Sequence, residues 1–150
     1  MTTTNALEKL LIVQACTDLI HRFADRIDAR DADALAEMFV EDGIFARPTA
    51  PDQPIQGRET LRAQFAARPA GKLTRHICTN TTVNVVSPSE ATARSLILLY
   101  TATLAEGAKL PVQADGKQLI GAYDDRIVRD SDGMWKFKER RGSLAMNVGG

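Results

Sequence analysis

The alternation of apolar and polar positions divides this chain into a helical first part and a strand-rich second part. Over residues 5–28 the apolar side chains recur at helical spacing, which predicts a long amphipathic helix. Asn5 and Glu8 stand three residues apart, as in a capping box, and predict where this helix begins. The apolar stripe of the helix consists of Ile12, Cys16, Leu19, Ile20, Phe23 and Ile27.

Two shorter helices are predicted to follow the first. One begins at Asp31 or Asp33 and ends at Gly43, ahead of a short strand over residues 44–46. The other begins at residues 57–61 and ends before residue 71. Prolines remove backbone donors, so the segment between the two helices is predicted to be an ordered loop or a flap. Its prolines are Pro48, Pro51 and Pro54.

From residue 73 onward the chain is rich in Thr, Val, Ile and Leu, which favour strands. Four long strands are predicted, over residues 74–86, 91–104, 117–129 and 134–144, with a loop over residues 105–115. Helices followed by antiparallel strands are typical of an α+β domain. Strands this long are expected to curve, so the predicted fold is one domain, residues 1–150, with a mostly antiparallel sheet packed on three N-terminal helices. Such a cone, or cup, can enclose a small molecule.

Composition narrows the classes of partner. The chain has 19 Lys plus Arg and 19 Asp plus Glu, so its formal net charge is zero. Nucleic-acid binding and a polybasic membrane anchor both need a positive excess, and neither is expected. No apolar run approaches the ~18 residues that span a bilayer. The first residues, MTTTN, lack the basic and apolar regions of a signal peptide, and we expect a cytoplasmic protein.

Motifs for cofactors are missing from the sequence. Cys16 and Cys78 are the only cysteines and do not form a CxxC pair, and no HxH or HExxH spacing occurs, so no metal site is predicted. No GxGxxG, P-loop or GxSxG motif is present. Chemistry without a cofactor is the remaining expectation.

Several short motifs, taken together in their order and spacing, resemble the SnoaL-like family within the NTF2-like (cystatin-like) superfamily. The segment from Phe23 to Asp31 and the run Glu41-Asp42-Gly43 are similar to the opening of these proteins. Thr74-Arg75-His76 and the run from Asp132 to Phe137 are similar to their strands. The resemblance covers almost the whole chain and implies the cone fold, but this superfamily carries many unrelated activities.

Within the family, the nearest similarity is to scytalone dehydratase and the bile-acid dehydratases. Those enzymes use an aspartate at the end of the first helix and a histidine on the first long strand, and Asp28 and His76 occupy these positions. The tyrosine that precedes the aspartate in the family is Ile27 here, and the place of a second histidine falls on Thr101. The resemblance therefore implies Asp–His acid–base chemistry without implying scytalone as the substrate.

The residues themselves leave two interpretations of each candidate. His76 lies in a strand whose alternate residues would share its face. It is therefore either an acid–base group in the pocket or a core histidine whose ring is hydrogen-bonded to a neighbouring hydroxyl or carbonyl group. Asp28 falls away from the apolar stripe on a helical wheel and is by pattern an exposed helix end, whereas the resemblance turns it inward. Tyr123 is either a core aromatic residue or a donor to a substrate oxygen. Arg140 and Arg141 are expected at a solvated strand end, with an anion clamp and an arginine that extends over the sheet as the alternatives.

The hypothesis is a lyase or isomerase of the dehydratase or polyketide-cyclase-like type, which acts on a small hydrophobic carbonyl or hydroxy compound. Asp28, His76 and Tyr123 are the predicted catalytic residues. The predicted substrate contacts are Phe23, Phe45, Phe65, Asn80, Tyr100 and Thr101. The alternative is a non-catalytic binding or accessory protein with the same cup. The predicted strands carry more apolar residues than one helix layer covers, Leu96, Leu98 and Ile120 among them, so a homodimer or homotrimer is expected.

Overall fold

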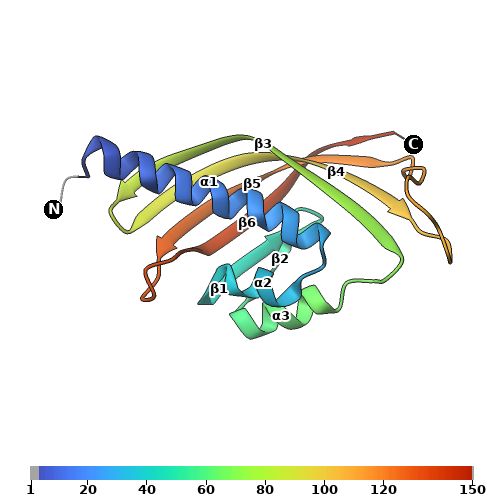
Figure 1. The fold of residues 1–150 in the computed structure, drawn as a ribbon, viewed down its shortest axis with the longest axis horizontal. Helices are drawn as coiled ribbons and strands as arrows, with labels where there is room; N and C mark the ends of the chain where they lie inside the picture. The colour runs from blue at the N-terminus through green and yellow to red at the C-terminus, as the bar shows by residue number, and fades with distance from the viewer. Residues whose placement is uncertain (1–3, 150) are drawn as a thin grey trace.

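Residues 4–149 are described by a computed structural model, in which three helices pack on one side of a curved six-stranded sheet (Figure 1). The helices are α1 (Ala6–Asp28), α2 (Ala32–Glu37) and α3 (Arg58–Ala66). The strands are β1 (Phe39–Arg47), β2 (Ala50–Gln56), β3 (Lys72–Ser87), β4 (Glu90–Thr103), β5 (Gln118–Arg129) and β6 (Trp135–Val148). The predicted α+β cone is confirmed.

The sheet is open and mixed, with strand order β2-β1-β6-β5-β4-β3. Neighbouring strands are antiparallel except β1 and β6, which are parallel. Figure 1 shows α1 lying across the long strands, while β1, β2, α2 and α3 gather at one end of it. This arrangement leaves a hollow between the C-terminal end of α1, α3 and the curved strands.

The core forms where the α1 stripe meets the inner side of the sheet. The six apolar residues that predicted the helix are all buried in it. Phe23 is 1% exposed and lies edge-on to five other aromatic rings. Those rings are Phe39, Phe45, Phe65, Tyr123 and Phe137. Edge-to-face packing of this kind adds to the burial energy and fixes the angle between α1 and the sheet.

The second helix is shorter than predicted, since it ends at Glu37 and not at Gly43. Phe39 already pairs with Phe137 of β6, so Gly43 lies inside β1. A Cβ at this glycine would lie 2.9 Å from the Cβ of Phe39. Glycine is therefore needed here for a close approach within an irregular strand, where the register with β6 shifts, and not to end a helix.

The proline-rich segment is a strand and not the predicted loop or flap. Residues Ala50–Gln56 form β2, which pairs with β1 at the edge of the sheet. An edge strand needs hydrogen bonds on one side only, so it tolerates prolines that a central strand would not. The turn between β1 and β2 carries Pro48 and Thr49 to the rim of the hollow.

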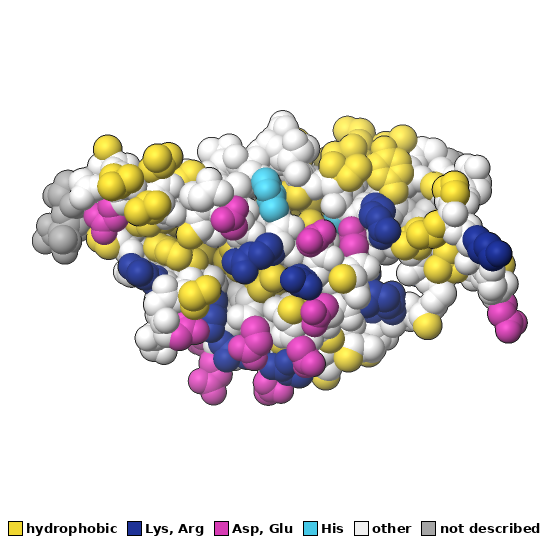
Figure 2. Space-filling view, in the orientation of Figure 1, with side chains coloured by type: hydrophobic (Ala, Val, Ile, Leu, Met, Phe, Trp, Pro, Cys, Tyr) yellow, Lys and Arg dark blue, Asp and Glu magenta, His cyan; other side chains and the backbone are white. Residues whose placement is uncertain are grey.

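Ion pairs tie α2 to α3. The Arg62 guanidinium contacts Asp33 at 2.6 Å, Glu37 at 2.8 Å and Glu59 at 3.2 Å. Figure 2 shows acidic and basic side chains interspersed over this lower part of the molecule. Within residues 4–149, no helix is long and apolar enough to cross a membrane. Cys16 and Cys78 are free thiols.

Candidate active site

Asp28 and His76 are in direct contact, although 48 residues separate them in the sequence. Asp28 is the last residue of α1, and His76 lies on β3, which curves around the end of this helix. The carboxylate Oδ1 is 2.6 Å from the ring Nδ1 of His76, and Oδ2 accepts the His76 amide at 2.8 Å. Thr74 donates its hydroxyl to Oδ1 at 2.9 Å. The His76 and Asp28 side chains are 10% and 13% exposed, so the pair is largely shielded from water.

These contacts favour the ionised form of Asp28 and determine which ring nitrogen of His76 faces it. Burial by itself raises the pKa of Asp28, but hydrogen bonds from the His76 ring, the His76 amide and Thr74 outweigh it and bring this pKa below its ordinary value. An ionised carboxylate only accepts, so Nδ1 carries the proton that it shares with Asp28. In the neutral form of the ring, Nε2, the other ring nitrogen, has a free lone pair. Within residues 4–149 no side chain or backbone group hydrogen-bonds to it.

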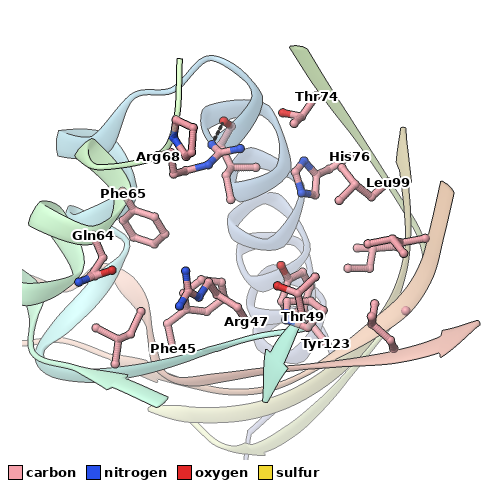
Figure 3. Close-up of a pocket in the computed structure, with 18 residues that line it drawn as sticks. Phe45, Arg47, Thr49, Gln64, Phe65, Arg68, Thr74, His76, Leu99 and Tyr123 are labelled. Carbon is pink, nitrogen blue, oxygen red and sulfur yellow. Dashed lines mark hydrogen bonds between the residues drawn. The ribbon is translucent and has the colours of Figure 1, made fainter. Parts of the chain in front are cut away.

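His76 lines a cavity of about 280 Å³ that opens under the end of α1 (Figure 3). The wall is mainly apolar, with Ile27, Phe45, Ile55, Phe65, Ile97, Leu99, Leu119 and Leu144. Its polar side chains are Arg47, Thr49, Gln64, Arg68, Thr74, His76 and Tyr123. Apolar walls with a few polar groups are typical of small-molecule sites.

Tyr123 belongs to the same cavity. Its ring is 3% exposed, and Gly121, its neighbour at period two on β5, also lines the hollow. Burial raises the pKa of Tyr123 to about 12, against an opposing effect of the Arg140 charge. The phenol therefore remains a hydrogen-bond donor throughout the physiological range of pH.

The structure brings only some of the predicted substrate contacts to this cavity. Phe45 and Phe65 line it, whereas Phe23 is packed behind them in the core. Tyr100 and Thr101 line a separate groove next to the loop after β4, where the Thr101 hydroxyl donates to Asp115 at 2.7 Å.

Asn80 is also outside the cavity. It is exposed and has a φ of 51°, at an irregularity where β3 loses register with β4. The alternation of inward and outward residues along a strand does not continue across such a bulge. This explains why Asn80 does not lie on the same face as His76, as the alternation predicted. Asn80, Tyr100 and Thr101 therefore lie outside the cavity that contains His76.

The basic side chains of the cavity were not predicted from the sequence. Arg68 follows α3, and its Nη1 donates to the Ile27 carbonyl at 2.6 Å (Figure 3). Arg47 is the last residue of β1. Neither residue is part of a motif, and Pro69 beside Arg68 indicated only the end of a helix. Their placement depends on how α3 and the β1–β2 turn fold over the sheet. In the described part of the chain, no cluster of three or more metal-ligating side chains occurs.

Comparison with known proteins identifies the family. The SnoaL-like domain matches residues 8–141, and the chain therefore belongs to the SnoaL-like family. A comparison with curated protein sequences finds no match.

Solved structures share the fold over nearly the whole chain. One, from Novosphingobium aromaticivorans and provisionally named a scytalone dehydratase, is 24% identical, with a TM-score of 0.81 and coverage of 97% of this chain and 92% of the other. A hexachlorocyclohexane dehydrochlorinase, LinA type 2, is 20% identical, with a TM-score of 0.78 and coverage of 97% and 93%. Rv3472 from Mycobacterium tuberculosis, a protein of unknown function, is 27% identical, with a TM-score of 0.72 and coverage of 91% and 77%.

Proposed function

We propose that this SnoaL-like protein is a cofactor-independent lyase or isomerase, of the dehydratase or cyclase type. The single observation that carries this proposal is the 2.6 Å contact between Asp28 Oδ1 and His76 Nδ1 at the wall of a mainly apolar cavity. When a carboxylate accepts a hydrogen bond from one imidazole nitrogen and the other nitrogen is free, the imidazole can act as a general base.

The proposed reaction is an elimination of water that begins with the removal of a proton from carbon. His76 Nε2 takes the proton from the carbon next to a carbonyl group, and Tyr123 donates its O–H to the enolate oxygen that forms. The electron pair then closes a carbon–carbon double bond as the β-hydroxyl leaves. The protonated His76 returns the proton to this hydroxyl, which departs as water and restores the neutral ring. Asp28 stabilises the imidazolium between the two transfers.

An isomerisation uses the same groups. If the enolate is protonated at another carbon, a double bond shifts, and if it attacks a second carbonyl group, a ring closes. Two of the similar structures are named for eliminations, one of water and one of hydrogen chloride. At their level of identity they support the fold, so the assignment to elimination depends on the Asp28–His76 geometry.

Proton abstraction can be tested separately from elimination. The probes are β-hydroxy ketones such as 4-hydroxy-4-phenylbutan-2-one, incubated in D₂O, with α-deuterium exchange followed by NMR and enone formation by absorbance. His76→Ala and Asp28→Asn are expected to lower both rates by about 10²–10⁴-fold, the usual contribution of a general base. Tyr123→Phe is expected to lower them by about 10²-fold, as for loss of one oxyanion donor.

His21→Ala is the matched control, because His21 is the other histidine and lies on the exposed side of α1, bonded to Thr81. Full activity of both His76→Ala and Asp28→Asn would show that the proposed mechanism is wrong. If the probes bind but no wild-type exchange or enone is detected, the alternative of a non-catalytic binding or accessory protein replaces the enzyme.

We further propose that the protein is a homodimer or homotrimer formed through the outer side of its sheet. Ile77, Leu98, Ile120 and Met146 form one row across four strands, since each is the register partner of the next. Ile77 and Met146 are 50% and 54% exposed. Leu98 and Ile120, which lie between them, are partly buried. An apolar row of this kind on the surface is typical of a region that another chain covers.

A further inference from the structure

The cavity has an uneven distribution of charge. The chain as a whole is neutral, with 19 basic and 19 acidic residues, but the side chains that line the cavity include Arg47 and Arg68 and no carboxylate. Asp28 is near the wall, but its two oxygens already accept from the His76 ring, the His76 amide and Thr74. The side chains that line the hollow therefore carry a net positive charge.

Arg68 is held in place for binding at this wall. Its Nη1 donates to the Ile27 carbonyl at 2.6 Å, at the last turn of α1. In return, the Arg30 guanidinium donates to the backbone carbonyls of Arg68 and Pro69, at 2.6 Å and 2.8 Å. These three hydrogen bonds link the end of α1 to the segment after α3. The Arg68 guanidinium is thus oriented before a ligand arrives, which reduces the entropy that binding would otherwise cost.

The charge of Arg68 is not matched by an acid. Within residues 4–149, no carboxylate oxygen lies within 4.0 Å of a nitrogen of Arg68 or of Arg47. Burial and the nearby Arg30 charge both lower the pKa of Arg68, with Asp28 opposing them. A half-buried cation in this situation is stabilised by any anion that enters the cavity. Arginine presents a planar fork of donors, which matches a carboxylate in particular.

The rest of the cavity sets the shape of such a ligand. Figure 3 shows Arg68 near His76, Arg47 on another side of the hollow, and the apolar strand residues, such as Leu99, away from both. A molecule that fits has an apolar body against the β4, β5 and β6 wall and a negative group toward the arginines. The volume of about 280 Å³ limits it to a small compound.

We propose that the cavity binds a small apolar molecule that carries a carboxylate, with Arg68 as the main partner of this carboxylate and Arg47 as a second contact. This proposal rests on the proposed function in that it names the class of substrate for the same site. It places the carboxylate on Arg68 and the reacting carbon next to His76. Arg47 and Arg68 are specificity residues, whereas Asp28 and His76 perform the proton transfers.

The first experiment compares pairs of ligands on the wild-type protein. Benzoate, cyclohexanecarboxylate and 3-phenylpropanoate are each titrated by calorimetry beside their uncharged amides, at low ionic strength to limit screening. A hydrogen-bonded ion pair is expected to favour at least one acid over its amide by about 10-fold or more. If no acid binds more tightly than its amide, including the case in which neither binds, the proposal is overturned.

The second experiment identifies the cationic partner. Arg68→Gln is expected to weaken the binding of the preferred acid by about 10-fold or more, Arg47→Gln by less, and neither is expected to change binding of the amide. Arg94→Gln is the matched control, because Arg94 is exposed on the outer side of the sheet and pairs with Asp124. Thermal unfolding checks that each variant is folded. The comparison of acids with amides needs no variant, so it decides the proposal even if Arg68→Gln does not fold.

A further variant separates this proposal from the proposed function. His76→Ala removes the base but leaves both arginines, so it is expected to keep the preference for acids. If His76→Ala loses this preference while Arg68→Gln keeps it, a protonated His76 binds the anion and the assignment to Arg68 is wrong. If acids bind through Arg68 but no proton exchange is detected on any probe, the binding proposal stands and the catalytic one fails.

Discussion

Two pairs of ionisable side chains that are shielded from water differ in their hydrogen bonds and in their surroundings. Asp28 makes three hydrogen bonds, which lower its pKa, and it is open to a cavity through His76. Asp125 and Arg140 are both buried in the core, with the nearest contact between Oδ1 and Nε at 3.7 Å. Neither Asp125 oxygen has a hydrogen-bond partner. The first pair lies at the wall of a cavity, whereas the second is a charge pair enclosed in the core.

Aromatic rings provide most of the surroundings of Arg140. Its guanidinium carbon lies 3.9 Å from the ring centre of Tyr123, 4.5 Å from Phe23 and 4.6 Å from Phe137. Cation–π contacts of this kind stabilise a desolvated arginine. The pattern of Arg140-Arg141 predicted a solvated strand end, which is wrong for Arg140, at 1% exposed. The sequence does not show that these three rings converge on one point.

Asp125 is expected to make stability fall as the pH rises from about 4 to about 6. Burial raises its pKa from 3.8 to about 6, although Arg140 opposes this rise. In this window the folded protein keeps a proton that the unfolded chain releases, so the contribution of Asp125 to stability is lost as the pH increases. The difference in free energy of unfolding between wild type and Asp125→Asn should therefore shrink or change sign between pH 4 and pH 6. Urea unfolding at several pH values measures it.

Asp124→Asn, on the outer side of the same strand, accounts for the general effect of removing one negative charge. A difference between wild type and Asp125→Asn that grows with pH would mean that Arg140 stabilises the carboxylate more than burial penalises it. The cation–π contacts would then be secondary to the ion pair in holding Arg140 within the core.

Among the elements, the turn between β1 and β2 has the most direct influence on the cavity. It places Arg47, Pro48 and Thr49 at the rim, and Pro48 lies against Gly142 of β6. The sequence predicted a loop here because three prolines argued against regular structure. Which residues form an edge strand depends on the order of strands in the sheet, and this order depends on the parallel pairing of β1 with β6. Such long-range pairing has no local signal in the chain.

Gly142→Ala is expected to disturb this turn. A Cβ at position 142 would lie 2.5 Å from both Cδ and Cγ of Pro48, and the proline ring cannot rotate away. Either β6 or the turn must shift, which is expected to cost about 1–3 kcal/mol of stability, as for other overpacked sites. Chemical denaturation measures the loss. Gly116→Ala is the matched control, since nothing lies within 4 Å of its Cβ position. Equal stability of the two variants would contradict the close contact with Pro48.

Over the whole molecule, the apolar pattern was sufficient to predict the cone, because a long helix with one stripe and four long strands have few ways to bury their apolar faces. The alternation only grouped His76 with Cys78, Asn80 and Thr82 on one face of its strand, and the resemblance to a family favoured the face that lines the cavity. The contact with Asp28 did not follow from the apolar pattern, since on a helical wheel this residue points away from the stripe. It is turned inward because β3 curls past the end of α1, and only the resemblance to a family indicated this. The positions of Arg47 and Arg68 in the cavity were indicated neither by the apolar pattern nor by the resemblance to a family.

The outer side of the sheet carries the last prediction, the state of association. Ile77 and Met146 lie at the two ends of the apolar row and make no contribution to the core. Ile77→Glu and Met146→Glu should therefore fold normally but place a charge in the interface between copies. We expect light scattering at micromolar concentration to give a dimer or trimer for wild type and a monomer for these variants. Val86→Glu, which is equally exposed at the other end of β3, should keep the wild-type mass. A monomeric wild type would instead mean that this row is open to solvent or serves a different partner.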